Sequence, residues 1–277
     1  MRGPDILART MSVPSRRGKS TRAWQYHSRS DHHSKVACWT LLFDMMIECD
    51  AFRSAVADKR VAFRINHVMV GPINKTLDLV VTVVPPTRDA RSRGSFARLA
   101  NSLDIKLSEA DLLVLGGLPT LEEDLKEDVS EVAIALEAKA CMTEHTKSLP
   151  RLHAEILATG YLAKRAAPSC ISVSYSLINA ADTFITPSGA GNKVNRHSQP
   201  DDARRVVDMI SHAVPRVSDS RDYGYDVVGA TTLDCRNDGS PVRVLVDSSV
   251  APAISEHTNY ERMIRSLCSE YRRRFAR

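Results

Sequence analysis

The distribution of apolar and polar residues predicts a chain of alternating strands and helices. One buried strand is expected at residues 131–142, EVAIALEAKACM, where apolar side chains occupy both sides until two charges appear near its end. Successive side chains of a strand point to opposite faces, so Glu137 and Lys139 project from the same face. Burying either charge alone is costly, so the two need each other, a metal ion or a polar cleft. An isolated Glu-x-Lys tripeptide is most simply a salt bridge at the end of a strand.

A second apolar strand is expected upstream, at residues 77–84, with the sequence LDLVVTVV. Asp78 lies near its start and shares a face with Val80 and Thr82. The two strands belong to a longer succession of helical and extended patterns, which predicts an α/β fold. The predicted elements are a helix at about 35–57, strands at about 61–71, 77–84 and 131–142, a helix at about 149–166 and a strand at about 169–179.

An aspartate that opens one strand and a Glu-x-Lys that ends a later strand, in this order of elements, resemble the PD-(D/E)xK nuclease superfamily. The resemblance covers roughly residues 35–180. It implies a restriction-endonuclease-like core, in which a central mixed sheet is flanked by helices, with an insertion and a C-terminal elaboration. Two features depart from the family pattern. Leu77 stands where the family usually has proline, and the long separation of Asp78 from Glu137 requires an insertion at about 86–130.

The resemblance also implies a metal site that hydrolyses phosphodiester bonds. Asp78 and Glu137 would be both catalytic residues and ligands of one or two Mg²⁺ ions, because two carboxylates can hold Mg²⁺ and leave water molecules on it. The backbone carbonyl of Ala138 would be a further ligand. Lys139 would act beside the metal, either as a base that orients the attacking water or as an electrostatic clamp on the phosphate. The sequence leaves these two roles open.

Acidic residues on the neighbouring helices are further candidates. In the family, the helix before the strands often lends an acid to the metal, and Glu48 is the candidate here. A solvent-facing carboxylate is the alternative interpretation of Glu48. Some relatives carry a glutamine and a tyrosine on the helix after Glu-x-Lys, but Glu155 and Tyr161 do not match that spacing. The prediction therefore gives them no role.

Composition and charge are those of a globular protein that tolerates an anionic partner. Of 277 residues, 43% are apolar and 26% charged, which excludes disorder throughout, and the net charge is +5. No apolar run approaches the length of a membrane helix, so no membrane association is expected. The cysteines form no Cys-x-x-Cys pair, which argues against zinc, and several lie in apolar segments, as expected of reduced thiols in a cytoplasmic protein. They are Cys38, Cys49, Cys141, Cys170, Cys235 and Cys268.

The chain divides into three parts. Residues 1–34 are rich in Arg and Ser, which predicts a flexible basic arm that contacts phosphates, with an inert tail as the equal alternative. Residues 35–195 form the predicted nuclease core. Residues 196–277 are expected to pack on the core as a recognition or dimerisation region, with an Asp238-Gly239 hairpin turn and a final helix from about Thr258. Apolar residues of that last helix could serve a dimer interface or the core of their own chain. They are Met263, Ile264, Leu267 and Phe275.

The resemblance to the nuclease superfamily implies a Mg²⁺-dependent endonuclease that acts on double-stranded DNA. A sequence-specific type II restriction enzyme is expected, working as a homodimer, because one active site reaches only one scissile bond at a time. A repair or mobile-element nuclease is the alternative within the same class. In a different class, the chain would be a non-catalytic nucleic-acid-binding protein in which Glu137 and Lys139 form only an ion pair.

Overall fold

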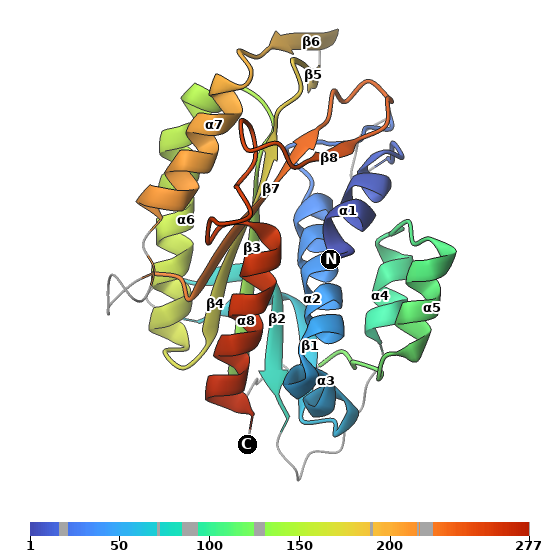
Figure 1. Cartoon of the computed structure of the whole chain (residues 1–277). Coiled ribbons are helices and arrows are strands. Elements are labelled where there is room, and N and C mark those ends of the chain that lie inside the picture. The colour runs from blue at the N-terminus through green and yellow to red at the C-terminus, as the bar shows by residue number, and fades with distance from the viewer. Residues whose placement is uncertain are drawn as a thin grey trace.

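The computed structural model has an α/β fold, in which a central mixed sheet of six strands is flanked by helices (Figure 1). The structure describes residues 1–16, 22–70, 73–84, 94–124, 131–188, 191–214, 216 and 224–276. The helices are α1 (Gly3–Met11), α2 (His32–Glu48), α3 (Asp50–Ala57), α4 (Phe96–Ser102), α5 (Glu109–Gly117), α6 (His145–Ala166), α7 (Asp201–Asp208), the π-helical η1 (Met209–Ala213) and α8 (Tyr260–Phe275). The strands are β1 (Val61–Met69), β2 (Lys75–Val83), β3 (Val132–Cys141), β4 (Ile171–Asn179), β5 (Thr183–Ser188), β6 (Gly191–Arg196), β7 (Val227–Asp234) and β8 (Arg243–Leu245).

The large sheet has the strand order β1-β2-β3-β4-β7-β8. β1, β2 and β3 form an antiparallel meander, whereas β3, β4 and β7 run parallel. β8 returns antiparallel to β7, and β5 and β6 make a separate hairpin. β3 therefore lies where the antiparallel half of the sheet meets the parallel half.

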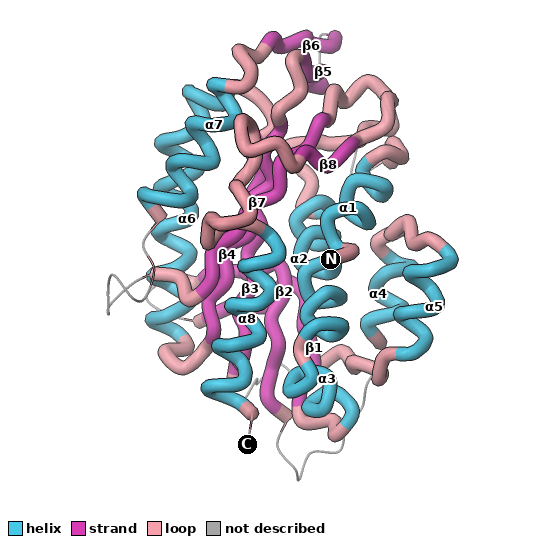
Figure 2. The backbone as a smooth tube through the Cα atoms, viewed as in Figure 1, coloured by secondary structure: helices cyan, strands magenta, loops and turns pink. Residues whose placement is uncertain are grey.

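Helices cover both faces of this sheet, as the tube in Figure 2 shows. α2 and α8 pack against each other and on β3, β4 and β7, and α6 and α7 pack together on the opposite side. On the side of α2, the ring of Trp39 stacks on the rings of Phe43 and Phe96. Its indole N–H donates to the backbone carbonyl of Phe96. Because helices cover both faces, every residue of β4 is buried, including Ser172, Ser174 and Ser176.

The predicted order of helices and strands around Glu-x-Lys is confirmed, with changed boundaries. The helix expected at 35–57 is two helices, because Cys49 adopts an extended conformation (φ −113°, ψ 97°) between α2 and α3. The helix expected at 149–166 begins at His145 and carries Pro150 inside it. The insertion expected between the second and third strands holds α4 and α5 in its described part.

The prediction of a flexible basic arm at residues 1–34 is wrong for the residues described. α1 buries Ile6 and Leu7 completely, and the carboxylate of Asp44 accepts the backbone N–H groups of Arg2 and Gly3. Arg2 itself forms an ion pair with an aspartate of α5. The basic composition of residues 1–34 drew attention away from the short apolar stripe of α1. The side chain of Arg2 is used in an ion pair within the chain.

The C-terminal region packs on the core, as expected. β7 and β8 pair across the predicted Asp238-Gly239 turn, where Gly239 has a φ of 96° that a side chain would disfavour. Met263, Ile264 and Leu267 of α8 are fully buried in the core of their own chain. Of the two interpretations of these residues, the structure supports the core, and a dimer interface must use other residues.

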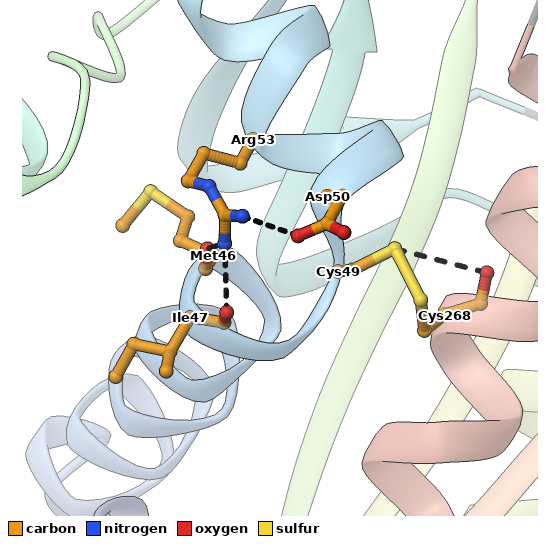
Figure 3. Close-up of a disulfide and its surroundings, with 6 residues drawn as sticks. All are labelled: Met46, Ile47, Cys49, Asp50, Arg53 and Cys268. Carbon is orange, nitrogen blue, oxygen red and sulfur yellow. Dashed lines mark hydrogen bonds and ion pairs between the residues drawn. A yellow bond between two sulfur atoms is a disulfide. The ribbon is translucent and has the colours of Figure 1, made fainter.

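Two of the six cysteines are paired, so the expectation of reduced thiols is wrong for them. Cys49 and Cys268 form a disulfide across 219 residues of sequence, with their Cα atoms 5.4 Å apart (Figure 3). Beside it, Arg53 donates to the carbonyl of Ile47 and pairs with Asp50, which satisfies the C-terminal end of α2. The disulfide joins the α2–α3 junction to α8, a proximity that only the folded chain creates. The other four cysteines are free and buried.

Candidate functional site

The antiparallel pairing of β2 with β3 brings the two predicted carboxylates together. Leu79 pairs with Leu136, so the next positions along the two strands are Asp78 and Glu137. The backbone N–H of Ala138 donates to Oδ2 of Asp78, 3.1 Å away. The carboxylate of Asp78 thus accepts a backbone N–H of β3 that a backbone carbonyl of β2 would accept if the strand pairing continued.

Asp78 is held from a third direction by α2. The hydroxyl of Ser34, in the first turn of that helix, donates to Oδ1 of Asp78 at 2.7 Å. Burial, and next the carboxylate of Glu137, raise the pKa of Asp78 from 3.8 to about 6, against the lowering effects of Ser34, Ala138 and Lys139. The raised pKa means that an ionised Asp78 lacks full compensation for its burial.

Glu137 has an asymmetric environment. Its side chain is 6% exposed, and Oε1 accepts two ammonium groups, from Lys75 at 2.8 Å and from Lys139 at 2.9 Å. Oε2 is buried and has no hydrogen-bond partner within the described part of the chain. The prediction that Glu137 and Lys139 share a face is confirmed. One carboxylate oxygen is saturated, and the other is free to accept a further donor or a cation.

Lys139 connects the strand to α6. Its Nζ lies 3.8 Å from Oε2 of Glu155, in addition to its contact with Glu137. Burial favours the neutral amine, but the pairing with Glu137, and then the charges of Glu155 and Asp78, raise the pKa of Lys139 above its usual 10.5. Lys139 is therefore an ammonium group at neutral pH. This state suits electrostatic stabilisation of a phosphate better than proton abstraction.

Glu48 does not join this cluster, so its assignment as a metal ligand is corrected. It is the last residue of α2 and is exposed, whereas Asp78 is contacted by Ser34 at the opposite end of the same helix. At 1.5 Å per residue, the two ends of the helix are about 20 Å apart. The alternative interpretation, a solvent-facing carboxylate, is the one that the structure supports.

Three members of the cluster were not predicted. Lys75 is three residues before Asp78, so strict strand alternation places it on the opposite face; its long stem nevertheless reaches Glu137. Ser34 lies in the first turn of α2, and its hydroxyl binds Asp78. Glu155 did not match the spacing of any motif. The sequence did offer one signal for Lys75, because it is an ionisable residue at the beginning of an apolar strand.

The cluster offers a divalent cation few but suitable ligands. The described ranges contain no group of three or more His, Cys, Asp and Glu side chains placed to hold a metal ion. They do contain two adjacent carboxylates, Asp78 and Glu137, with one orphaned buried oxygen that a cation would satisfy. Mg²⁺ commonly uses one or two carboxylates and keeps several waters. The residues therefore fit a hydrated Mg²⁺ ion, but not a closed cage of protein ligands.

A separate cavity of about 370 Å³ lies between α1, the β7–β8 hairpin and the start of α8. Its lining includes Asp5, Thr231, Val244 and Tyr260. Asp78, Glu137 and Lys139 do not contribute to it. The polar cluster and this cavity are therefore separate features of the molecule.

No protein-family model, curated protein or solved structure matches this chain. Among the described residues, no helix is both long and apolar enough to span a membrane.

Proposed function

We propose that this protein is a Mg²⁺-dependent endonuclease with a restriction-endonuclease-like core, acting on double-stranded DNA as a type II restriction enzyme does. The observation that carries the proposal is the free, buried Oε2 of Glu137 next to Asp78, with the ammonium group of Lys139 alongside. The order of a helix, three antiparallel strands, a helix and a parallel strand supports it. Most buried acceptors in folded proteins have a hydrogen-bond partner, so the unused Oε2 supports a bound group at this position.

Each residue has a distinct role in this proposal. Asp78 and Glu137 would hold the metal ion, with the Ala138 carbonyl as a further ligand, and Ser34 and the Ala138 N–H fix the Asp78 carboxylate in place. When bound, Mg²⁺ supplies a water molecule of lowered pKa and neutralises charge on the phosphate oxygens. The Lys139 ammonium would stabilise the negative charge that develops as the phosphodiester bond breaks.

Assembly and location follow from the same proposal. Cutting both strands of a duplex requires two sites, and a twofold homodimer would supply the second one. Action on chromosomal or invading DNA would place the protein in the cytoplasm. The Cys49–Cys268 disulfide is unusual in that compartment, because cytosolic thiols are kept reduced. A monomer that nicks single strands would instead favour the repair or mobile-element alternative.

One observation favours a non-catalytic nucleic-acid-binding protein. The two lysines balance the charge of the carboxylate cluster, so Glu137 has cationic partners in the absence of metal. In that alternative, the cluster is an ion-pair network beneath a surface that contacts phosphates, and divalent ions have no effect on it. Removing Mg²⁺ separates the two functions.

A plasmid-nicking assay in Mg²⁺ and in EDTA tests the proposal. We expect wild-type protein to convert supercoiled plasmid to nicked or linear forms only with Mg²⁺, and Glu137→Gln and Lys139→Met to lose at least 100-fold in rate, in the range seen when groups that stabilise a transition state are removed. Glu261→Gln and Lys106→Met are matched controls, since both residues form exposed surface ion pairs. Cleavage by either site variant at the wild-type rate would contradict the assignment.

A further inference from the structure

Lys75 forms an ion pair with Glu137, the same carboxylate that would bind the metal ion in the proposed function. Its Nζ lies 2.8 Å from Oε1 of Glu137, the same oxygen that accepts Lys139. When Asp78 is ionised, Asp78 and Glu137 balance the charges of Lys75 and Lys139, and the half-exposed Glu155 beside Lys139 adds one further negative charge. A divalent cation on Asp78 and Glu137 would turn this balance into an excess of one positive charge and would place two positive charges next to both ammonium groups, and like charges at such short distances repel strongly. One of the two ammonium groups must therefore move away or find a new anion.

The surroundings of the two lysines indicate which one moves. Lys139 is on the same strand as Glu137, two residues on, and it has a second acidic neighbour, Glu155. Lys75 is the first residue of β2, and in the described part of the chain Glu137 is its one ion-pair partner. Its side chain is 25% exposed and the residues just before it, Ile73 and Asn74, are exposed. Four flexible carbons let its ammonium group turn outward without changing the strand.

We propose that Lys75 is a phosphate-binding residue that exchanges partners. In the free protein its ammonium neutralises Glu137; when a divalent cation takes Glu137, the ammonium turns to a phosphate of the nucleic acid next to the cluster. This inference rests on the proposed function. Lysine suits the role because it binds phosphate as a mobile point charge. No covalent bond is made or broken. The Lys75–Glu137 ion pair is replaced by a contact of Glu137 with the cation and a contact of Lys75 with the phosphate.

The exchange has a signature that a fixed phosphate contact lacks. Each phosphate contact contributes roughly 0.9 to the slope of log affinity against log salt concentration for duplex DNA. If Lys75 reaches the phosphate only when a cation is bound, removing its charge should lower this slope by about 0.9 in the presence of the cation and leave it unchanged in EDTA. Removing the competing ammonium should also tighten cation binding several-fold in the absence of DNA.

The test compares wild type with Lys75→Met, which keeps the length of the stem, and Lys75→Arg, which keeps the charge. Fluorescence anisotropy with a labelled duplex gives the salt slope in EDTA and in Ca²⁺, with the duplex checked by gel for intactness, and calorimetry gives Mg²⁺ affinity without DNA. Lys106→Met is the control, because Lys106 pairs with an exposed aspartate two residues away. We expect only Lys75→Met to show the cation-dependent loss of slope and the tighter Mg²⁺ binding.

Each other outcome overturns the exchange in an identifiable way. An equal loss of slope with and without the cation would make Lys75 a permanent phosphate contact. Unchanged slopes and unchanged Mg²⁺ affinity in Lys75→Met, while wild type binds both ligands, would leave Lys75 as a fixed ion pair of Glu137 and keep the proposed function intact. If the wild-type protein itself binds no divalent cation, both the exchange and the proposed function are rejected.

Discussion

Two buried carboxylates in this protein each meet two cationic side chains, with opposite consequences. Asp226, at the start of β7, accepts Lys164 of α6 and both the N–H and the hydroxyl of Ser172 at Oδ2, and Arg274 of α8 at Oδ1. Glu137 accepts both of its lysines at Oε1 and has a bare Oε2. The first carboxylate is saturated from two helices and a strand, whereas the second has unused capacity.

The pKa values of the two regions reflect this difference. Burial alone would raise the pKa of Asp226, but hydrogen bonds from Lys164, Ser172 and Arg274 hold it below its usual value. In the other cluster, burial and the neighbouring Glu137 raise the pKa of Asp78 to about 6. The Asp226 cluster therefore stabilises the fold and fastens α8, which the disulfide also holds. The Glu137 cluster keeps a buried charge under-compensated, which is a feature of functional sites.

The largest expected effect is the contrast between Asp226→Asn and Glu137→Gln. Asp226→Asn leaves two cations buried beside a neutral amide that has one acceptor fewer, and breaking a buried pair of this kind costs about 3–5 kcal/mol. Glu137→Gln should cost less, about 1–3 kcal/mol, because Lys75 and Lys139 are somewhat more exposed than Lys164 and Arg274 and because Oε2 of Glu137 had no partner to lose. Urea unfolding at pH 7 measures both. Equal destabilisation would remove the distinction between the two clusters.

A smaller effect is expected from Asp78→Asn, and it depends on pH. Because the pKa of Asp78 in the folded protein is raised from 3.8 to about 6, folding favours the protonated form, and its ionisation lowers the free energy of unfolding as pH rises through this window. The shift corresponds to at most about 3 kcal/mol. Asparagine carries no charge, and its amide can still pair with Ser34 and the Ala138 N–H.

We therefore expect Asp78→Asn to be more stable than wild type by about 1–3 kcal/mol at pH 8 and equal to it near pH 4, while losing cleavage activity. Chemical denaturation at the two pH values gives the difference directly. Asp58→Asn, at an exposed turn, is the matched control. A variant that is less stable than wild type at pH 8 would mean that the Asp78 charge is fully compensated in the fold.

The sequence predicted the parts of this account that depend on local periodicity. Alternation along β3 placed Glu137 and Lys139 on one face, and the apolar segments gave the order of strands and helices around them. Local periodicity does not predict contacts between segments that are distant in the sequence. Lys75 reaches Glu137 through a long side chain that alternation assigns to the other face, and Asp226 meets partners more than forty residues away. Helix α1 was missed because the basic composition of residues 1–34 concealed a few apolar positions.

The central claim is that the carboxylate cluster of β2 and β3 holds a divalent cation. Electron paramagnetic resonance of Mn²⁺, which occupies the same oxygen-rich sites as Mg²⁺, measures free and bound ion directly. The account predicts saturable Mn²⁺ binding by wild type that Mg²⁺ displaces, its loss in Glu137→Gln, and its retention in the control Glu261→Gln. Equal binding by wild type and Glu137→Gln, or no saturable binding by wild type, would contradict it.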